Sequence, residues 1–513
     1  MCVKEGKEIC FISDMYLPEE IVKEILIKCG YEKGILFVSS KYQKRKRNGV
    51  LFSVVQEKFH KKSWLHIGDN LCSDVIAARK NGIRGILIKR DIVNTTYSDF
   101  KRIHENLSYN TMTAFINNRI QKYHNSYEKI GYEVFGPILY GFVMWLEKNT
   151  NAQEKIVFLA REGKIMKKAF EIINSQKETI YMHVSRHAVC IPYLEEFNTF
   201  NGFEKVFRNT IHRLYTNREF CKECGLKEND IQEILFRLNL EENELCTRDT
   251  QEKIVTRFEN IIKENAKLQK ELLGKYINQI GICKENVLVD VGWHGTIQKQ
   301  LTGLCYRTEN DEEISFRGMY IGIRNADTNE TMQIMDKCGY IDFIKSSYIS
   351  SVLAYTITFF EMFFLGTDGT TIEYKMDNEN AKIVPVLGKP ENRIVEKNIH
   401  YMQDAALNFV KDINSHKLHK IFDFDSEDTM RNYVNMTTRA KKKTRLLFAN
   451  FKVYDGNEYL LMGAKSFLYY FLHPWQFKKD FLNNRCKLWF LKNLLVIPFP
   501  YVKFLDVLKK YDK

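Results

Sequence analysis

The sequence predicts an α/β protein whose cores are parallel sheets. Short apolar strands alternate with amphipathic helices through the N-terminal part, which is the pattern of a parallel, doubly wound sheet. The same alternation returns after residue 126, and the chain beyond residue 330 is mostly helical in pattern. A chain of 513 residues is too long for one ordinary core. We therefore expect α/β domains at 1–95 and 126–330, a connector at 96–125, and a helical C-terminal region at 331–513.

The elements of the first domain follow from its apolar runs and their punctuation. Pro18 stands where proline is tolerated, at the opening of a helix, and Gly82 stands where a helix commonly ends. In order, we expect a strand at 8–13, a helix that Pro18 opens, a strand at 34–40, a helix at 50–59, a strand at 64–68, a helix that Ser73 caps, and a strand at 83–88.

Polar side chains follow these strands, at the sheet edge where ligands bind. Ser13 and Asp14 follow the first strand, Asp69 follows the third, and Asp74 comes one helical turn later. Lys46 lies in a basic loop before the second helix. A hydroxyl, a lysine and carboxylates that converge at one edge suit a phosphate and a hard cation such as Mg²⁺. The alternative is ordinary: caps, a turn residue and a surface charge.

Three segments carry a family resemblance: FISDMYLP, SSKYQKRKRNGVLF and HIGDNLCSD. They resemble the second, third and fourth motifs of haloacid dehalogenase (HAD) superfamily hydrolases, above all the large proteins of that class found among bacterial surface-polysaccharide genes. The resemblance implies that Ser13, with Asp14 beside it, binds a phosphoryl group, that Lys46 stabilises it, and that Asp69 and Asp74 hold Mg²⁺. It also implies a phosphorylated small molecule or sugar as substrate and a place in cell-surface polysaccharide biosynthesis.

The first motif of that family has no counterpart before Ser13. This Asp-x-Asp follows the first strand and supplies the nucleophile and the general acid. The triplet at Asp423 and Asp425 follows a Lys-rich helical stretch, so we do not expect it to substitute. We expect a HAD-like sheet that lacks its first strand, with two inward edges unpaired. A truncated chain, an upstream-encoded fragment that completes the domain, and a degenerate domain remain open. Hydrolysis by this chain alone is not expected, because Mg²⁺ and lysine cannot replace a carboxylate nucleophile.

In the second domain we expect a helix at 132–147 and strands at 155–160, 180–184, 287–291 and 318–323. Polar clusters again follow strands and would meet at one sheet edge. The candidate site residues of this domain are Arg161, Glu162, Ser185, Arg186, Asp290, Gly292, Trp293, His294, Gly295 and Thr296.

The residue types of this second cluster suit an anionic ligand. Arg161 and Arg186 could grip phosphate or carboxylate, the glycines allow close backbone approach, and Thr296 opens a helix whose N-terminus favours an anion. Trp293 offers a stacking face, and Asp290 could hold a hydroxyl or a cation. The alternative is a capping Asp290, a core Trp293 and surface ion pairs.

Resemblance adds little to this second cluster. VLVDVGWHGTI is faintly similar to the phosphate-binding loop of phosphoribosyltransferases. The same clusters accompany the hydrolase part in the polysaccharide-associated proteins, without an established reaction. A transferase acting on a phosphorylated sugar or nucleotide is therefore a second hypothesis.

The C-terminal region predicts a hairpin at Glu373 to Leu387 and a basic, aromatic tail at Arg485 to Lys513. The tail would suit either contact with an anionic membrane surface or a terminal helix docked on the body. A non-catalytic, membrane-associated scaffold is thus a third hypothesis. Cys221 and Cys224 form a lone CxxC, for which we expect no zinc.

Composition limits the class and the compartment. Hydrophobic residues make up 44% and charged residues 27% of the chain, as in ordinary globular proteins. The net charge of +13 permits phosphorylated or membrane partners, and we expect no nucleic-acid partner. Scattered cysteines in apolar runs indicate reduced thiols, and the N-terminus lacks a signal peptide. The longest apolar stretch, Val352 to Gly366, contains Glu361 and is typical of a core helix. We expect a cytoplasmic protein, with the inner membrane face as an alternative.

Overall fold

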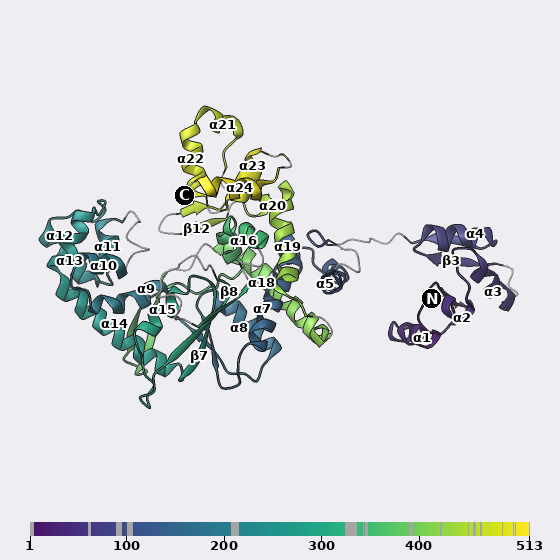
Figure 1. The fold of residues 1–513 in the computed structure, drawn as a ribbon, viewed down its shortest axis with the longest axis horizontal. Helices are drawn as coiled ribbons and strands as arrows, with labels where there is room; N and C mark the ends of the chain where they lie inside the picture. The colour runs from purple at the N-terminus through teal and green to yellow at the C-terminus, as the bar shows by residue number, and fades with distance from the viewer. Residues whose placement is uncertain are drawn as a thin grey trace. The chain divides into compact units, whose positions relative to one another are not determined.

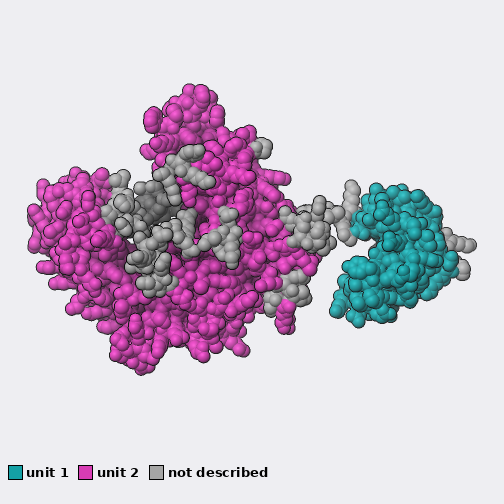
Figure 2. Space-filling model, in the orientation of Figure 1, with its two compact units in different colours: residues 1–94 teal, residues 95–513 magenta. Residues whose placement is uncertain are grey.

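The chain forms two compact units, unit 1 (residues 1–94) and unit 2 (residues 95–513) (Figure 2). The computed structural model describes residues 5–59, 63–88, 95–99, 106–206, 215–323, 336–341, 343, 347–388, 393–420, 423–449, 451–454, 458–461, 464–484, 486–495, 497 and 499–511.

Unit 1 alternates strands and helices as the sequence predicts. Its strands are β1 (Cys10–Ser13), β2 (Ile35–Val38), β3 (Leu65–Gly68) and β4 (Arg84–Leu87). Its helices are α1 (Glu19–Lys28), α2 (Ser39–Tyr42), α3 (Val50–Lys58), the π-helical turn η1 (Leu71–Ile76) and α4 (Ala77–Lys80). One detail differs from the expectation. Asn70 rather than Ser73 caps the third helical segment, because the Asn70 side chain accepts hydrogen bonds from the backbone N–H groups of Cys72 and Ser73.

The strands of unit 1 form two separate parallel pairs. β1 pairs with β2, and β3 pairs with β4. Among the residues that the structure describes, no strand joins the two pairs, so β1 and β3 each keep one edge without a partner. Phe52 of α3 lies in a cluster with Ile12 and Trp64, which packs beside both pairs. Leu65 and Ile67 of β3 remain 53% and 52% exposed. Parallel strand pairs that alternate with helices agree with the parallel α/β architecture that the sequence predicts, and the loss of a central strand stays a prediction.

Unit 2 is built on one five-stranded, fully parallel sheet with the order β6-β5-β7-β8-β9. Its strands β7 and β8 are labelled in Figure 1. Its strands are β5 (Lys155–Leu159), β6 (Thr179–Met182), β7 (Glu285–Trp293), β8 (Ser315–Ile323) and β9 (Lys337–Ile341). The sequence predicts the first four. It misses β9, whose KCGYI segment lacks the long apolar run of a central strand.

Helices account for most of the remaining residues of unit 2. Before β9 they are α5 (Leu107–Asn117), η2 (Ile120–Lys122), α6 (Ser126–Ile130), η3 (Gly131–Phe135), α7 (Gly136–Lys148), α8 (Gly163–Ile173), α9 (Arg186–Cys190), η4 (Ile191–Glu195), α10 (Phe200–Val206), α11 (Asn217–Glu223), α12 (Glu228–Leu238), α13 (Arg248–Arg257), α14 (Glu259–Gln279) and α15 (Thr296–Gly303). After β9 they are α16 (Ser347–Ala354), α17 (Ile357–Met362), α18 (Arg393–Ser415), η6 (Leu418–Lys420), α19 (Ser426–Arg439), α20 (Lys442–Leu447), α21 (Phe467–Leu472), α22 (Pro474–Asn483), α23 (Lys487–Leu495) and α24 (Tyr501–Tyr511). Two antiparallel hairpins are β10 (Thr371–Asp377) with β11 (Lys382–Leu387), close to the predicted hairpin, and β12 (Lys452–Tyr454) with β13 (Glu458–Leu460).

Both faces of the five-stranded sheet are buried, as expected for parallel strands. Successive side chains of β5 alternate between two cores: Ile156 and Phe158 belong to one, Val157 and Leu159 to the other. Helices α7, α8 and α18 pack together on the first core, while α14 and α15 lie on the second. The C-terminal helices α19 and α23 join the first core, where Trp489 is fully buried. The predicted α/β fold with a mostly helical C-terminal region is confirmed.

The start of unit 2 is fixed by a buried carboxylate. Glu133 of η3 accepts hydrogen bonds from the backbone N–H groups of Thr96, Tyr97 and Ser98, at 2.5 to 2.9 Å. Helix α5 then contributes buried side chains such as Tyr109 to the main core. The residues that the sequence assigns to a connector thus include part of the core of unit 2. The sequence does not predict α5 as a core helix, because polar residues interrupt its apolar side chains and obscure their helical spacing.

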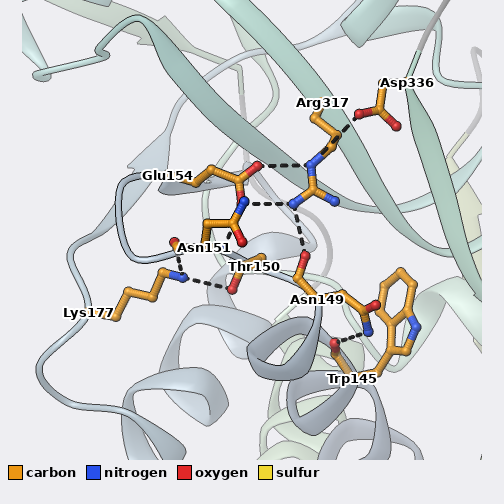
Figure 3. A network of polar contacts seen from close by, with 8 residues as sticks. All are labelled: Trp145, Asn149, Thr150, Asn151, Glu154, Lys177, Arg317 and Asp336. Carbon is orange, nitrogen blue, oxygen red and sulfur yellow. Dashed lines mark hydrogen bonds and ion pairs between the residues drawn. The ribbon is translucent and has the colours of Figure 1, made fainter.

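A polar network closes the amino-terminal edge of the sheet (Figure 3). The guanidinium of Arg317 on β8 donates from Nε and one terminal nitrogen to the two carboxylate oxygens of Glu154, at 2.9 and 2.8 Å. The same guanidinium donates to the backbone carbonyl of Asn149. Because β7 lies between β5 and β8, this ion pair spans a strand and ties the loop before β5 to β8.

The C-terminal tail begins with a helix, α23, that is docked on the main core. Leu488, Trp489, Phe490 and Leu491 of α23 are buried in the main core, as expected for a docked terminal helix. In the part of the chain that the structure describes, no helix combines the length and the apolar character needed to cross a bilayer.

Candidate functional site

The candidate site of unit 1 lies where β1 and β3 end. Asp14 follows β1, Lys46 lies between α2 and α3, and Asp74 is on η1 after β3. The backbone N–H of Lys46 donates to Asp14 Oδ1 at 2.7 Å, and the Lys46 ammonium donates to Asp74 Oδ1 at 2.6 Å. Lys46 therefore joins residues that the sequence places far apart. The Lys46 and Asp74 side chains are only 13% and 3% exposed.

Asp74 is the most heavily bonded group of this site. Its Oδ1 also lies 3.3 Å from His66 Nε2, and its Oδ2 accepts from the backbone N–H of Asn70 at 2.9 Å. Gly68 makes room for the carboxylate, because a Cβ at that position would lie 2.3 Å from Asp74 Cγ. The end of β3 and the turn that follows it are thus shaped around one carboxylate.

The shifted pKa values of Asp74 and His66 determine their charge states at neutral pH. Burial by itself would raise the pKa of Asp74, but the hydrogen bonds from Lys46 and Asn70 and the lysine charge outweigh burial and leave the pKa below its ordinary value. Burial also lowers the pKa of His66, against the hydrogen bond to Asp74 that raises it, so the imidazole is neutral at pH 7. An ionised Asp74 therefore faces a lysine and a neutral histidine.

Two other expected residues of unit 1, Ser13 and Asp69, lie at the ends of β1 and β3. Ser13 ends β1, and the described residues give its hydroxyl no hydrogen bond to Lys46 or Asp74. Asp69 follows β3 directly, but the lysine bond belongs to Asp74. His66 was not singled out by sequence. The only signal for it is its place in HIGDN, two residues before Gly68 and therefore on the same side of β3.

The hydrogen bonds of this cluster bear on the expected magnesium site. Mg²⁺ requires several oxygen ligands in near-octahedral geometry. Both oxygens of Asp74 already accept hydrogen bonds, and Asp14 Oδ1 accepts one from Lys46. In the described residues, no group of three or more His, Cys, Asp or Glu side chains is placed to hold a metal. Asp74 serves here as the acceptor for Lys46, and the ligand role that the resemblance implies for Asp69 and Asp74 stays a prediction.

A second candidate site lies at the carboxyl edge of the sheet of unit 2, centred on Asp290 near the end of β7. Burial raises the pKa of Asp290 to about 7, helped by the nearby carboxylates of Glu162 and Glu361 and opposed by Arg186. Glu361 also accepts a hydrogen bond from Trp293 Nε1 at 2.7 Å. Three carboxylates and an arginine thus influence one another at this edge.

Three of the candidates in unit 2 have clear structural roles. Trp293 is 6% exposed and packs its ring against Phe343 and Phe360, as the core alternative predicts. Ser185 caps α9 and donates to the carbonyl of Thr371 at 2.6 Å. Thr296 is the first residue of α15. A stacking role for Trp293 is therefore wrong, because its ring is already enclosed.

The glycines and His294 shape the turn after β7. Gly292 has a φ of +115°, and a Cβ there would lie 2.4 Å from the carbonyl oxygen of Gly322. Gly295 has a φ of +70°. The turn thus depends on glycine, and His294 is exposed at its tip.

Beside Asp290, the ends of β5 and β6 hold a polar cluster that sequence reasoning missed. Lys164 Nζ lies 2.9 Å from Asp368 Oδ1, and Tyr181 OH donates to Asp368 Oδ2 at 2.9 Å. Asp368 and Glu162 both act, after burial, to raise the pKa of Tyr181, whereas Arg161 lowers it. Arg161 and Glu162 therefore lie close to this cluster. The sequence does offer a signal for Lys164, because FLAREGK places it about one helical turn after Arg161. Asp368 has no such signal, because it lies in a distant loop that contains no motif.

Comparison with known proteins addresses unit 1 and the start of unit 2. Residues 44–107 match the sequence model of a family described as HAD-hydrolase-like. This stretch begins in the loop of Lys46 and includes β3, Asp74 and β4. No curated protein matches the chain. This part of the chain is therefore HAD-hydrolase-like, in agreement with the resemblance of its motifs.

Proposed function

We propose that unit 1 is a phosphoryl-binding unit of the HAD phosphohydrolase type, centred on Lys46. One observation carries the proposal: the backbone and side chain of Lys46 join Asp14 to Asp74 at the carboxyl ends of β1 and β3. Ligands of parallel sheets bind at this edge. The HAD-hydrolase-like match over residues 44–107 supports the same class.

The chemistry of the cluster suits binding more than turnover. The ammonium of Lys46 has three N–H donors, and Asp74 takes one of them. The remaining donors can neutralise a phosphoryl oxygen, while Asp74 holds the ammonium in place. The carboxylates of Asp14 and Asp74 both accept hydrogen bonds from Lys46, so this cluster offers neither as a nucleophile. Covalent catalysis of the HAD type uses a carboxylate nucleophile.

A strand inserted between the two pairs of unit 1 would supply a partner for the open strand edges and a carboxylate nucleophile. The free edges of β1 and β3 can each pair with one further parallel strand, and the half-exposed Leu65 and Ile67 would gain cover. A carboxylate at the end of that strand would emerge beside Lys46. We propose that a segment of this kind, on the same or a separate polypeptide, completes the domain.

The test is hydrolysis of p-nitrophenyl phosphate by two proteins. One is the chain as it stands. The other carries an added N-terminal segment that encodes a strand ending in Asp-x-Asp. We expect activity only in the extended protein, and we expect Lys46→Ala to abolish it while Lys44→Ala, in the same loop, does not. Activity of the chain as it stands, or none in either protein, would refute the proposal.

A finer proposal concerns the substrate. We propose a phosphorylated sugar of cell-surface polysaccharide assembly, supported by the likeness of the three motifs to the proteins among such genes. A panel of sugar phosphates, compared with nucleotides and inorganic phosphate in competition binding, tests this point. Tighter binding of a nucleotide would contradict it.

A second candidate function belongs to unit 2. The placement of Asp290 at the carboxyl edge of the sheet, near Glu162, Glu361 and Arg186, is the observation that favours it. Burial there raises the pKa of Asp290, and a carboxyl with a raised pKa can exchange protons with a substrate hydroxyl. We propose transfer to or from a phosphorylated sugar or nucleotide at this edge. The variant Asp290→Asn should bind the ligand but not turn it over. Full turnover would exclude the role.

A further inference from the structure

Helices α21 and α22 form a helical hairpin that is firmly attached by one side. Tyr470 is 5% exposed, and its ring lies 5.6 Å from that of Phe477 and 5.9 Å from that of Phe490 on α23. Its hydroxyl donates to Asp480 Oδ2 at 2.8 Å, which joins the two helices. The hairpin projects from the top of unit 2 in the view of Figure 1. The contacts of Tyr470 therefore hold the hairpin in place, and side chains on its outer surface are not needed for this.

The opposite side of the hairpin is apolar and open to solvent. Phe471, Leu472 and Trp475 are 73%, 65% and 82% exposed, although their chemistry favours burial. The spacing of the exposed residues on α21 places them on one side of the helix. We call this surface the docking face; its members are Phe467, Leu468, Phe471, Leu472 and Trp475.

The docking face is bordered by positive charge. Lys465 precedes α21, and Lys478 and Lys479 lie on α22, all three exposed. The acidic residue of the hairpin, Asp480, is occupied by Tyr470 and by Gln476, whose side-chain nitrogen donates to it at 2.6 Å. Apolar side chains are thus surrounded by cations, without an exposed carboxylate on the described hairpin.

We propose that the docking face binds the surface of an anionic lipid bilayer. This inference goes beyond the function proposed above. Aromatic and aliphatic side chains that project from a short helix can enter the acyl boundary, tryptophan favours the interface, and lysines pair with anionic headgroups. A protein partner would need both a groove for the projecting side chains and carboxylates for the same lysines. Binding is peripheral, because α21 and α22 are far too short to span a bilayer.

The hairpin, and not α23, is the membrane element in this proposal. The apolar residues of α23, Leu488 to Leu491, are already buried in the core. In the basic, aromatic tail that the sequence indicates, the first helix, α23, therefore stays packed on unit 2. The proposed membrane contact lies on α21 and α22, just before this tail.

Sedimentation with vesicles tests the proposal on the full chain. One set of vesicles contains phosphatidylcholine and phosphatidylglycerol in equal parts, and the other contains phosphatidylcholine alone. We expect binding to the anionic vesicles. The combined variant Phe471→Ser, Leu472→Ser and Trp475→Ser should lower the partition coefficient at least about tenfold, because apolar insertion supplies most of the attraction. The control is Phe236→Ser, which removes an 87% exposed phenylalanine on α12.

Two further measurements make the outcome decisive. Lys478→Glu with Lys479→Glu should weaken binding to the anionic vesicles and reduce its dependence on salt, since Lys465 remains. Tryptophan emission should shift to shorter wavelength on binding in the full chain but not in Trp475→Phe, with a fold that circular dichroism shows to be unchanged. Absence of binding, equal binding by the triple variant, or self-association that the triple variant abolishes without any vesicle binding would each overturn the proposal.

Discussion

Lys46 Nζ lies 2.6 Å from Asp74 Oδ1, and this contact connects the loop before α3 to the turn after β3. Lys46 follows the β1–β2 pair in the chain, and Asp74 lies between the paired strands β3 and β4. The described residues contain no strand between these pairs. The ion pair links them together with the cluster around Phe52 and the hydrogen bonds of Ser53 and Gln56 to Asn81. The same pair is thus both a structural link and the candidate phosphoryl site.

Replacing Lys46 with Met should destabilise unit 1 at neutral pH. The substitution leaves Asp74, which is 2% exposed, as a buried charge without its cation, at a cost of about 3 kcal/mol. Hydrogen exchange of unit 1 peptides measures the effect. Lys44→Met is the matched control, and Lys46→Met combined with Asp74→Asn should recover much of the loss. Equal effects at Lys44 and Lys46 would contradict the assignment.

Unit 1 should also lose stability in acid. The folded-state pKa of Asp74 is below its ordinary value of 3.8. Its contribution is therefore complete above that value and is lost as the pH falls through the folded pKa. Asp74→Asn should remove this part of the acid dependence of unfolding, measured by urea titration across the acidic range. An unchanged acid profile in the variant would show that Asp74 does not act in this way.

Asp290 predicts the opposite pH dependence in unit 2. Its folded-state pKa of about 7 exceeds the ordinary 3.8, so the folded state binds the proton more tightly. The stability of unit 2 should fall as the pH rises from near 4 through about 7. Asp290→Asn should flatten this decline in melting temperature, and Asp249→Asn on the surface of α13 should not. A steeper decline in the Asp290 variant would contradict the burial argument.

Glu133→Ala should loosen the start of unit 2. The change leaves the backbone N–H groups of residues 96–98 without their acceptor, and each buried, unpaired donor costs about 1 to 3 kcal/mol. We expect a fall in unfolding free energy of about 3 kcal/mol or more, with faster hydrogen exchange at residues 95–99. The control is Glu252→Ala, which is exposed on α13.

Arg317→Lys should destabilise unit 2 without affecting ligand binding. Lysine cannot reproduce the two-pronged contact with Glu154, and we expect a loss of about 1 to 2 kcal/mol. The pair lies at the amino-terminal edge of the sheet (Figure 3), whereas Asp290 lies toward the carboxyl ends. Binding at the Asp290 site that weakens as much as stability would contradict this separation.

Local patterns predicted much of the fold, and long-range contacts explain what they missed. Apolar runs located four strands of each unit, because a buried parallel strand is continuously apolar. The sequence does not predict β9, because its five residues contain no such apolar run. Lys46 and Asp74 were singled out from motifs, but their direct pairing was not.

Other parts of the candidate sites could be seen only in three dimensions. Glu361 was assigned to an apolar core helix, and its bond to Trp293 Nε1 crosses 68 positions. Asp368 meets Lys164 across 204 positions. No periodicity in the sequence encodes contacts at such separations. His66 was missed for a different reason, since a lone histidine in a strand has no distinctive spacing.

The most direct measurement is the affinity of the full chain for inorganic phosphate, by calorimetric titration at low salt. The account predicts measurable binding that Lys46→Ala abolishes and that Lys44→Ala, in the same basic loop, leaves within about twofold, because only Lys46 is held by Asp74. Phosphate binding that survives Lys46→Ala, or that both variants weaken equally, would contradict the central claim.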